Sequence, residues 1–244
     1  MVHWPEVMVE YEEKEKILFS ADGFGKFGAL SADEDWACEA RRYYFNIVGK
    51  YGAPVQTLLK KAANLYIKTI CPLHGPILKE NLGYYIDKYN TWSSYQPEDE
   101  GVLVAYASIH GNNEKAAKLI AKTLEEKGAP KVAITDLTRD DMAEAIEDAF
   151  RYSKLIIAAS SYDGGVFPPM EDFLNRLSHK AYQNRTVGLV ENGSWAPCAA
   201  RVMKGFVENM KNITICDNTV TIKSTLKDAD MDSVSALVDE ILNK

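Results

Sequence analysis

The chain has 244 residues, a formal net charge of −7 and a hydrophobic fraction of 46%. This composition is ordinary for a folded protein of one or two domains and argues against disorder. No apolar run is long enough to cross a bilayer, and the N-terminal sequence lacks the features of a signal peptide, so we expect a cytoplasmic protein without a membrane partner. From residue 98 onward, 17 Lys and Arg stand against 23 Asp and Glu, which argues against nucleic acid as a partner.

The first half contains two strand-like runs, each followed by a candidate metal ligand. Lys16–Ser20 precedes Asp22, and Tyr66–Cys71 precedes His74, which stands in a turn between two prolines. The residues alone favour ordinary turn roles, because Asp is common in turns and a lone His in a turn is usually structural. The four cysteines show no CxxC spacing, so we expect free thiols rather than ligands of zinc or rubredoxin-type iron.

A polar stretch without periodicity, Thr91–Glu100, follows these runs and contains a proline. Such a stretch is typical of a linker between domains. The sequence therefore predicts two domains, residues 1–97 and residues 98–244.

Beyond the linker, apolar runs typical of buried strands alternate with helical patterns. We expect strands at Val102–Tyr106, Lys131–Leu137, Leu155–Ala159, Thr186–Val190 and Ile213–Lys223. Amphipathic segments between and after these strands predict five helices. Such alternation predicts an α/β fold in which helices cover both faces of a parallel sheet. In these sheets, ligands bind at the carboxyl ends of the strands.

Three of these strands are followed by unusual loops. The first, Ser108–Asn113, offers hydroxyl, amide and N–H groups to an anion at a helix N-terminus; the alternative is that Asn112 simply caps the helix. In the second, Ser160–Pro169, paired glycines allow close approach to a flat ligand and two prolines suit a helix start; the alternative is a long tight connection. In the third, Glu191–Pro197, Trp195 either packs on the sheet edge or offers a ring face to a planar ligand.

Together the three loops resemble the FMN site of the flavodoxin family, and the match is closer to one branch, the flavodiiron proteins (A-type flavoproteins). The segments YASIHGNNEKAAKLIA and VENGSWAPCAARVM are similar to the flavodoxin domain of that branch. The segments MVHWPEVMVEY, KILFSADGFGKFG and ICPLHGPIL are similar to successive stretches of its metallo-β-lactamase-like domain. The resemblance implies a flavodoxin-like five-stranded parallel sheet, in the order 2-1-3-4-5, preceded by a partial metallo-β-lactamase-like α+β segment.

By this resemblance, the three loops bind FMN. The first would hold the phosphate, the second would lie along the flavin and ribityl chain, and the third would cover the ring, with Trp195 stacked on it. Asn113 stands where the family usually has a hydroxyl residue. The cofactor-binding residues are therefore expected to be Ser108, Ile109, His110, Gly111, Asn112, Asn113, Ser160, Ser161, Tyr162, Asp163, Gly164, Gly165, Asn192, Gly193, Ser194, Trp195 and Ala196.

The resemblance also places three ligands of the family's diiron centre on His3, Asp22 and His74. Imidazoles suit iron, and a carboxylate can bridge two metal ions. The family's other ligands come from an HxExDH motif, which this sequence lacks. Three ligands do not hold two irons in the family's manner, so we do not expect a complete diiron centre within this chain alone.

The resemblance implies an FMN-binding electron-transfer flavoprotein related to flavodiiron O2/NO reductases, with an incomplete diiron site. One alternative is a non-redox binding or assembly module that retains the flavodoxin fold. Another is one chain of a two-chain O2/NO reductase, an oxidoreductase whose partner chain carries the missing metal ligands. Hydrolysis is disfavoured, because the HxHxDH cluster of hydrolytic relatives is also absent. The other expected partners are a redox donor, either rubredoxin-like or a reductase, and a second copy in a homodimer.

Overall fold

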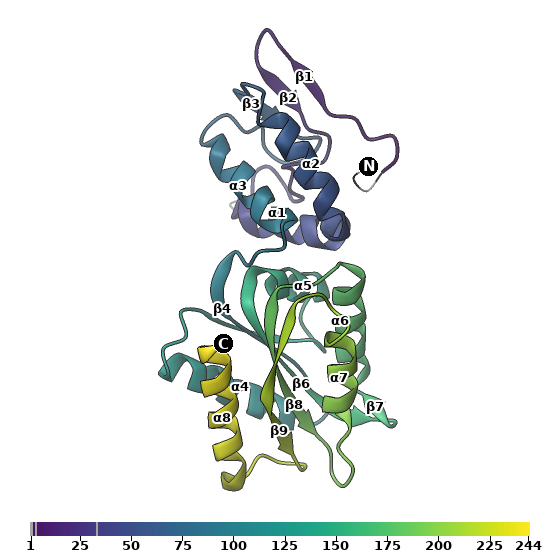
Figure 1. Ribbon diagram of the computed structural model, residues 1–244, viewed down its shortest axis with the longest axis vertical. Helices are drawn as coiled ribbons and strands as arrows, with labels where there is room; N and C mark the ends of the chain where they lie inside the picture. Colours follow the sequence, from purple (N-terminus) through teal and green to yellow (C-terminus); the bar gives the residue numbers. More distant parts are fainter. Residues whose placement is uncertain (1, 3, 33) are drawn as a thin grey trace. The chain divides into compact units, whose positions relative to one another are not determined.

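The computed structural model describes residues 2, 4–32 and 34–244, which form two compact units, Met1–Gln96 and Pro97–Lys244 (Figure 1). The predicted linker is wrong in its extent. Helix α3 (Leu82–Ser93) continues into it, and strand β4 (Asp99–Ala107) begins before it ends. Within the described ranges, no helix combines the length and the apolar content that a bilayer crossing requires.

The first unit contains a small three-stranded sheet. Strand β1 (Glu10–Glu12) pairs antiparallel with β2 (Ile17–Phe19), and β2 pairs parallel with β3 (Thr69–Cys71). Strands β2 and β3 lie within the two strand-like runs of the sequence, and each is shorter than its run. The predicted ligands Asp22 and His74 therefore follow neighbouring parallel strands, which places both at the same edge of this sheet.

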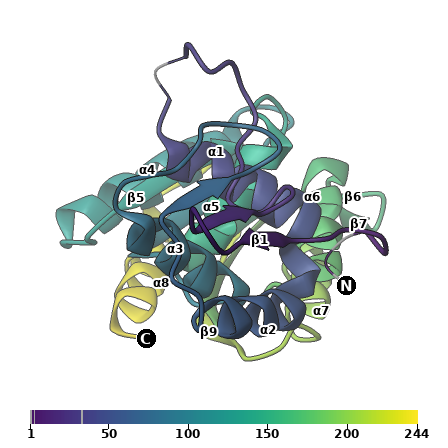
Figure 2. The ribbon, with the colours of Figure 1, turned by 90° about the horizontal axis from the view of Figure 1, so that it is seen from above.

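Helices make up the rest of the first unit. Helix α1 (Trp36–Tyr43) starts at Asp35, whose carboxylate accepts hydrogen bonds from two N–H groups of the first turn. It continues through a π-helical turn (Tyr44–Val48) and a 3-10 turn (Gly49–Tyr51) into α2 (Gly52–Ala62). Helices α2 and α3 lie side by side, joined by a hydrogen bond from Gln56 to Asn90 (Figure 2). Four aromatic side chains pack between the helices: Trp36, Tyr44, Tyr89 and Trp92.

The second unit is built on a parallel sheet. Its strands lie in the order β5 (Val132–Asp136), β4, β6 (Tyr152–Tyr162), β8 (Arg185–Asn192) and β9 (Ile213–Ile222), and all neighbours in this row are parallel. In chain order these are the second, first, third, fourth and fifth strands of the row. The predicted order 2-1-3-4-5 is therefore confirmed. A short strand that was not predicted, β7 (Gly165–Val166), pairs antiparallel with the end of β6.

Helices cover both faces of this sheet, as the alternating pattern predicts (Figure 1). Helices α4 (Asn112–Glu126) and α8 (Met231–Asn243) pack on one face, where the buried core includes Val104, Ile156 and Leu237. Helices α5 (Met142–Arg151), α6 (Pro168–His179) and α7 (Ala199–Val207) pack on the other. A 3-10 turn (Asp228–Asp230) leads into α8. Side chains of β4 alternate between the two cores, so the strand is buried on both faces and reads as a continuous apolar run.

Strand β9 departs from regular pairing with β8. The register shifts between Val187 and Leu189, so that β9 bulges at residues 216–218. Glu240 of α8 fills the bulge, because its carboxylate accepts hydrogen bonds from the backbone N–H groups of Asp217, at 2.6 Å, and Asn218, at 2.8 Å. The helix thereby satisfies donors that the strand ladder leaves without a partner.

Candidate functional site

The first loop connects β4 to α4 and presents the start of that helix. Gly111 is the N-cap and has a φ of 79°, a left-handed conformation that glycine adopts without strain. Asn112 is therefore the first helical residue, and the alternative that it caps the helix is wrong. The N–H groups of the first helical turn have no acceptor within the helix, and the helix dipole adds a partial positive charge. This loop therefore offers hydrogen-bond donors and a partial positive charge, both of which favour a bound anion.

Two buried polar atoms in this loop have no hydrogen-bond partner in the protein: Oγ of Ser108 and Oδ1 of Asn113. A buried polar atom without a partner costs free energy, and a ligand can relieve that cost. The Ser108 hydroxyl can donate a hydrogen bond, so it fits a phosphate oxygen. The amide nitrogen of Asn113 is already engaged, since it donates to the carbonyl oxygen of Ala107 and to Oγ of Ser160, both at 2.9 Å.

The second loop is a tight hairpin between β6 and β7. Its two central residues, Asp163 and Gly164, have φ values of 48° and 73°. Positive φ at both positions matches the strand twist, and Asp-Gly is a favoured pair for such a turn. Gly165 is already in β7, so only one glycine of the predicted pair has positive φ. The prediction that a helix starts at the two prolines is confirmed, because α6 begins at Pro168.

The third loop follows β8 and is held at both ends. A Cβ on Gly193 would lie 2.7 Å from Cα of Pro197, so the loop closes only with glycine at this position. Asn192 exchanges two hydrogen bonds with Ser224, which follows β9: its amide nitrogen donates to the Ser224 carbonyl, and its amide oxygen accepts from the Ser224 N–H. Trp195, at the tip, is 90% exposed and does not pack on the sheet edge.

Residues from all three loops line one small pocket of about 190 Å³. Its lining consists of Ser108, Ile109, His110, Asn112, Asn113, Ser160, Ser161, Asn192, Gly193, Ser194 and Ser224. Every one of these except Ser224 is a predicted cofactor-binding residue. A lone serine after the last strand carries no sequence signal, so Ser224 could not be found in advance. The remaining predicted residues, which lie outside this lining, are Gly111, Tyr162, Asp163, Gly164, Gly165, Trp195 and Ala196.

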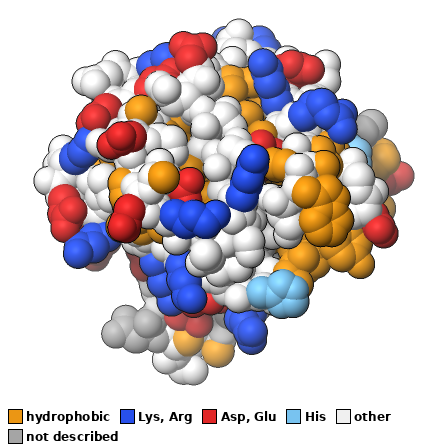
Figure 3. All heavy atoms as spheres, turned by 90° about the horizontal axis from the view of Figure 1, so that it is seen from below, with side chains coloured by type: hydrophobic (Ala, Val, Ile, Leu, Met, Phe, Trp, Pro, Cys, Tyr) orange, Lys and Arg blue, Asp and Glu red, His pale blue; other side chains and the backbone are white. Residues whose placement is uncertain are grey.

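The pocket is smaller than the several hundred cubic ångströms typical of whole-ligand sites, so it suits one end of a ligand, such as a phosphate group. Exposed apolar side chains stand on the same three loops: Ile109, Tyr162 and Trp195. Figure 3 shows the molecule from below, and hydrophobic side chains gather toward one edge of that view. A polar pocket beside exposed rings suits a ligand with a charged end and a flat apolar end.

Hydrogen bonds of two side chains, Asn113 and Ser161, join the three loops. Asn113 links the first loop to Ser160 at the start of the second. The neighbouring hydroxyl of Ser161 accepts hydrogen bonds from the N–H groups of Cys198, at 2.7 Å, and Ala199, at 3.1 Å. It thereby caps the start of α7 from another strand and ties the second loop to the third. Several predicted cofactor residues therefore also hold the loops together.

In the first unit, Asp22 stands in a turn with unusual backbone angles. Ala21 and Phe24 both have positive φ, 51° and 65°, which L-residues adopt only at a cost. The surroundings hold this turn in place: the Phe24 N–H donates to the Tyr89 hydroxyl at 2.8 Å, and the Phe24 carbonyl accepts from the Trp36 ring nitrogen at 3.1 Å. The N–H and the carbonyl of Phe24 are thus both hydrogen-bonded, which holds the strained turn in place. Backbone strain of this kind is often found at functional sites.

His74 lies next to Asp22, as the sheet topology requires. Its Nδ1 atom lies 3.2 Å from the carbonyl oxygen of Lys26, which can only accept, so Nδ1 carries a proton, and in the neutral ring Nε2 presents a lone pair. That Nε2 atom lies 3.5 Å from Oδ1 of Asp22, is buried and has no hydrogen bond. A lone pair beside a carboxylate oxygen fits a bound cation, and a carbonyl behind the imidazole is the usual support for a metal ligand.

Three neighbours shape this pair. A Cβ on Gly25 would lie 2.7 Å from the His74 ring, and the Phe27 ring stacks on the imidazole at 4.4 Å. Burial raises the pKa of the Tyr43 hydroxyl, and the charge of Asp22 and a hydrogen bond to it raise that pKa further. Tyr43 therefore stays protonated and supports the carboxylate.

The third predicted metal ligand, His3, lies outside the described residues. Among the residues that are described, no three His, Cys, Asp or Glu side chains come together in a way that could hold a metal ion. Asp22 and His74 therefore fit as two ligands of a metal, and they need further ligands to complete a site.

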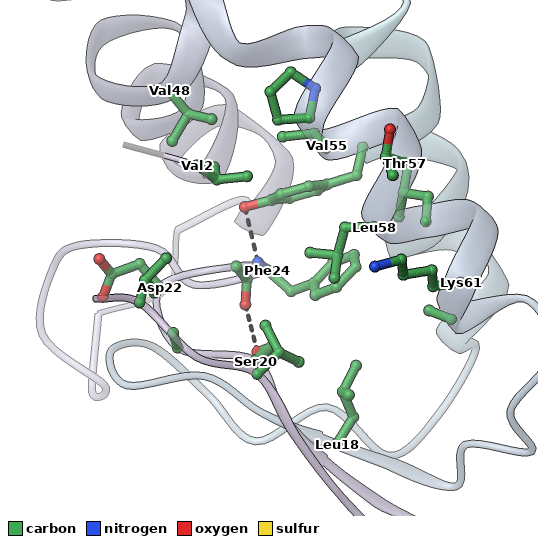
Figure 4. Close-up of a pocket in the computed structure, with 18 of the residues that line it drawn as sticks. Val2, Leu18, Ser20, Asp22, Phe24, Val48, Val55, Thr57, Leu58 and Lys61 are labelled. Atoms are coloured by element: carbon green, nitrogen blue, oxygen red, sulfur yellow. Dashed lines mark hydrogen bonds between the residues drawn. The ribbon is translucent and has the colours of Figure 1, made fainter. Parts of the chain in front are cut away.

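An open groove of about 840 Å³ adjoins Asp22 (Figure 4). Its walls are mainly apolar, with Leu18 of β2 opposite Val55 and Leu58 of α2. Among the described residues, thirteen of the seventeen large hydrophobic side chains that are strongly exposed belong to the first unit, although it is the shorter one. The apolar groove, together with this concentration of exposed hydrophobic side chains in one unit, marks the first unit as a candidate interaction surface.

Comparisons with known proteins agree with this geometry. A family model described as "Flavodoxin domain" matches residues 103–215. An uncharacterized protein of Methanocaldococcus jannaschii is 27% identical over 93% of this chain and 59% of its own length. An anaerobic nitric oxide reductase flavorubredoxin of Aeromonas hydrophila is 26% identical over 80% of this chain and 41% of its own length. The chain thus spans about three fifths or less of these relatives.

Solved structures extend the likeness to both units. The rubredoxin oxygen:oxidoreductase of Desulfovibrio gigas matches with a TM-score of 0.90 at 22% identity, covering 100% of this chain and 63% of that one. A flavo di-iron protein variant from Thermotoga maritima matches with a TM-score of 0.82 at 26% identity, covering 98% of this chain and 62% of that one. The likeness includes the first unit as well as the flavodoxin-like second unit.

Proposed function

We propose that the chain belongs to the flavodiiron protein family and that its second unit binds FMN and transfers electrons through it. One observation carries this proposal: loops at the carboxyl ends of β4, β6 and β8 line a single polar pocket in which the Ser108 hydroxyl is buried without a partner. FMN would supply one- and two-electron transfer, and the protein's part is to bind the flavin and set its environment.

Each of the three loops would bind a different part of FMN. The phosphate would occupy the pocket, where the N–H groups at the start of α4 and the Ser108 hydroxyl can donate to it. The hairpin of the second loop would lie along the ribityl chain. The exposed Trp195 ring would cover the isoalloxazine ring, because its 90% exposure leaves a face open for stacking.

Reconstitution tests the binding step. Flavin-free protein is titrated with FMN, and binding is followed by quenching of flavin fluorescence. We expect saturation at one FMN per chain, and a protein that binds no FMN would refute the proposal. The bound flavin is then reduced, and reoxidation by an electron acceptor is followed by absorbance. A protein that binds FMN but whose flavin cannot be reduced would fit the non-redox module instead.

A second candidate is that this chain forms part of an O2/NO reductase whose remaining metal ligands come from another polypeptide. Two observations favour it: the Asp22–His74 pair fits a metal but is incomplete among the described residues, and the apolar groove beside Asp22 could receive a further segment. Iron and flavin are measured together in protein purified from its natural host. Iron together with FMN supports this candidate, and FMN with negligible iron supports the simple electron carrier.

Two partners belong to the same proposal. A redox donor, rubredoxin-like or a reductase, would reduce the flavin, and a second copy of the chain would form a homodimer. The exposed apolar surface of the first unit supports association. Sedimentation of the purified protein tests the dimer, and a monomer at micromolar concentration would contradict it.

A further inference from the structure

We propose that the side chain of Asn113 is a positioning group of the flavin site, which ties the first loop to the second and does not contact the phosphate. The inference rests on the proposed binding of FMN by the second unit. The sequence resemblance places Asn113 in the loop that would hold the phosphate. We assign its side chain to holding the loops together instead.

The hydrogen bonds of Asn113 fix the orientation of its amide. Its Nδ2 atom lies 2.9 Å from the carbonyl oxygen of Ala107, which can only accept. The reversed amide would place two acceptor oxygens against each other, so the NH2 group must face Ala107. Its second hydrogen goes to Oγ of Ser160, also at 2.9 Å.

This orientation leaves the side chain of Asn113 without a donor for the phosphate, whereas its backbone N–H belongs to the first turn of α4 and stays available. An amide nitrogen has two hydrogens, and both are engaged. The remaining polar atom, Oδ1, is buried, has no partner and can only accept a hydrogen bond. A phosphate oxygen also accepts, so the two would repel each other. The Ser108 hydroxyl, buried nearby without a partner, is the side chain that can donate.

The position of Asn113 explains what the amide does instead. Asn113 is in the first turn of α4, Ala107 is the last residue of β4, and Ser160 stands near the end of β6. One side chain that is 1% exposed therefore joins a helix start to two strand ends. The next residue, Ser161, accepts the N–H groups at the start of α7, so the connection reaches the third loop. A hydroxyl side chain has a single donor and could not make both bonds of Asn113.

The test compares FMN with riboflavin, which lacks the phosphate. Dissociation constants are measured for the wild type and for Asn113→Ala, Ser160→Ala, the double variant and Ser108→Ala. We expect Asn113→Ala to weaken both flavins by the same factor, on the order of tenfold, because the tie supports all three loops. The double variant should lose less than the two single losses combined, since one interaction is shared. Ser108→Ala is the matched control and should weaken FMN alone.

Loss of FMN affinity with unchanged riboflavin affinity in Asn113→Ala would make Asn113 a phosphate ligand and overturn the inference. If the wild type binds neither flavin, the proposed function fails, and hydrogen exchange of the flavin-free protein still tests the tie. Asn113→Ala should then speed amide exchange in residues 108–113 and 160–166, whereas Ser108→Ala should not. Equal exchange in the wild type and Asn113→Ala would overturn the inference.

Discussion

The Nε2 atom of His74 lies 3.5 Å from Oδ1 of Asp22, at the shared edge of two parallel strands. Because the pair presents a lone pair and a carboxylate, we expect the wild type to bind cobalt(II), detected by its visible absorption, and Asp22→Ala to lose about tenfold or more in affinity. Flavin content should stay unchanged, since the two sites lie in different units. Asp232→Ala, on α8, is the control; equal cobalt binding in Asp22→Ala and the wild type would contradict a metal role.

Replacing Gly25 by alanine should destabilise the first unit. The added Cβ would lie 2.7 Å from the His74 ring and from its backbone oxygen, so the ring or the turn must move, at a cost of about 1–3 kcal/mol. Gly83 is the matched control, because a Cβ there meets nothing within 4 Å and alanine suits the first turn of α3. Urea unfolding measures both variants. Gly25→Ala with unchanged stability would show that the turn adjusts freely.

Removing the Trp195 ring should weaken flavin binding without affecting the fold. The side chain is 90% exposed, so Trp195→Ala should leave the thermal midpoint of the flavin-free protein unchanged. Loss of a stacked aromatic pair costs about 0.5–1.5 kcal/mol beyond the buried area, which corresponds to a severalfold loss of FMN affinity. Trp195→Phe keeps a ring and should lose less. An unchanged FMN affinity in Trp195→Ala would refute the stacking.

Ser161→Ala should loosen the start of α7. The Ser161 hydroxyl accepts the N–H groups of Cys198 and Ala199, and its loss leaves two donors without this partner, at a cost of about 1 kcal/mol in unfolding free energy. Because the same bonds hold the third loop against the second, affinity for FMN should also fall. Ser194→Ala, a change at an exposed serine of the same pocket, should preserve stability. Equal denaturation midpoints for the two variants would contradict the cap.

Glu240 should make the second unit sensitive to acid. Burial opposes its charge, but hydrogen bonds from Lys244 and from residues 217 and 218 outweigh burial and lower the pKa of the carboxyl from 4.5 to about 2. A carboxyl whose pKa is lower in the folded state adds stability above its unfolded pKa and loses it as the pH falls toward the folded value.

Unfolding free energy, measured between about pH 5 and pH 2, should therefore fall more steeply in the wild type than in Glu240→Gln. Glu125→Gln, an exposed change on α4, is the control and should follow the wild type. Identical pH profiles for the wild type and Glu240→Gln would show that the bulge in β9 does not depend on this charge.

The parallel sheet could be predicted because its strands are buried on both faces. Val102–Tyr106 reads as a continuous apolar run for that reason. The start of β4 was missed, since Asp99 is polar and pairs with Lys131 and Arg151 through ion pairs. None of helices α1, α2 and α3 is predicted from the sequence. The strands of the first unit have only three residues each, too short to show a period.

The sequence predicts which loops form the candidate site, but not the hydrogen bonds within it. Loops that follow parallel strands lie at the same edge of the sheet, where the carboxyl ends of the strands meet. The sequence alone therefore indicates that the three loops form one site. The roles of Asn113 and Ser161 could not be predicted, because their hydrogen-bond partners depend on how the strand ends align. Asn113 bonds to Ala107 and Ser160. Ser161 bonds to Cys198 and Ala199. A sequence shows which residues can donate or accept a hydrogen bond, and only the fold decides which of them remain available to a ligand.

The pocket between the three loops has neither Lys nor Arg among the described residues that line it. A phosphate held there would be bound by fixed N–H and O–H dipoles rather than by mobile cationic side chains. Salt weakens interactions between exposed charges and also screens the helix dipole, but it screens buried hydrogen-bonding groups much less. The affinity for a flavin seated there should therefore fall less with added salt than the affinity of a site that holds its anion with surface arginines.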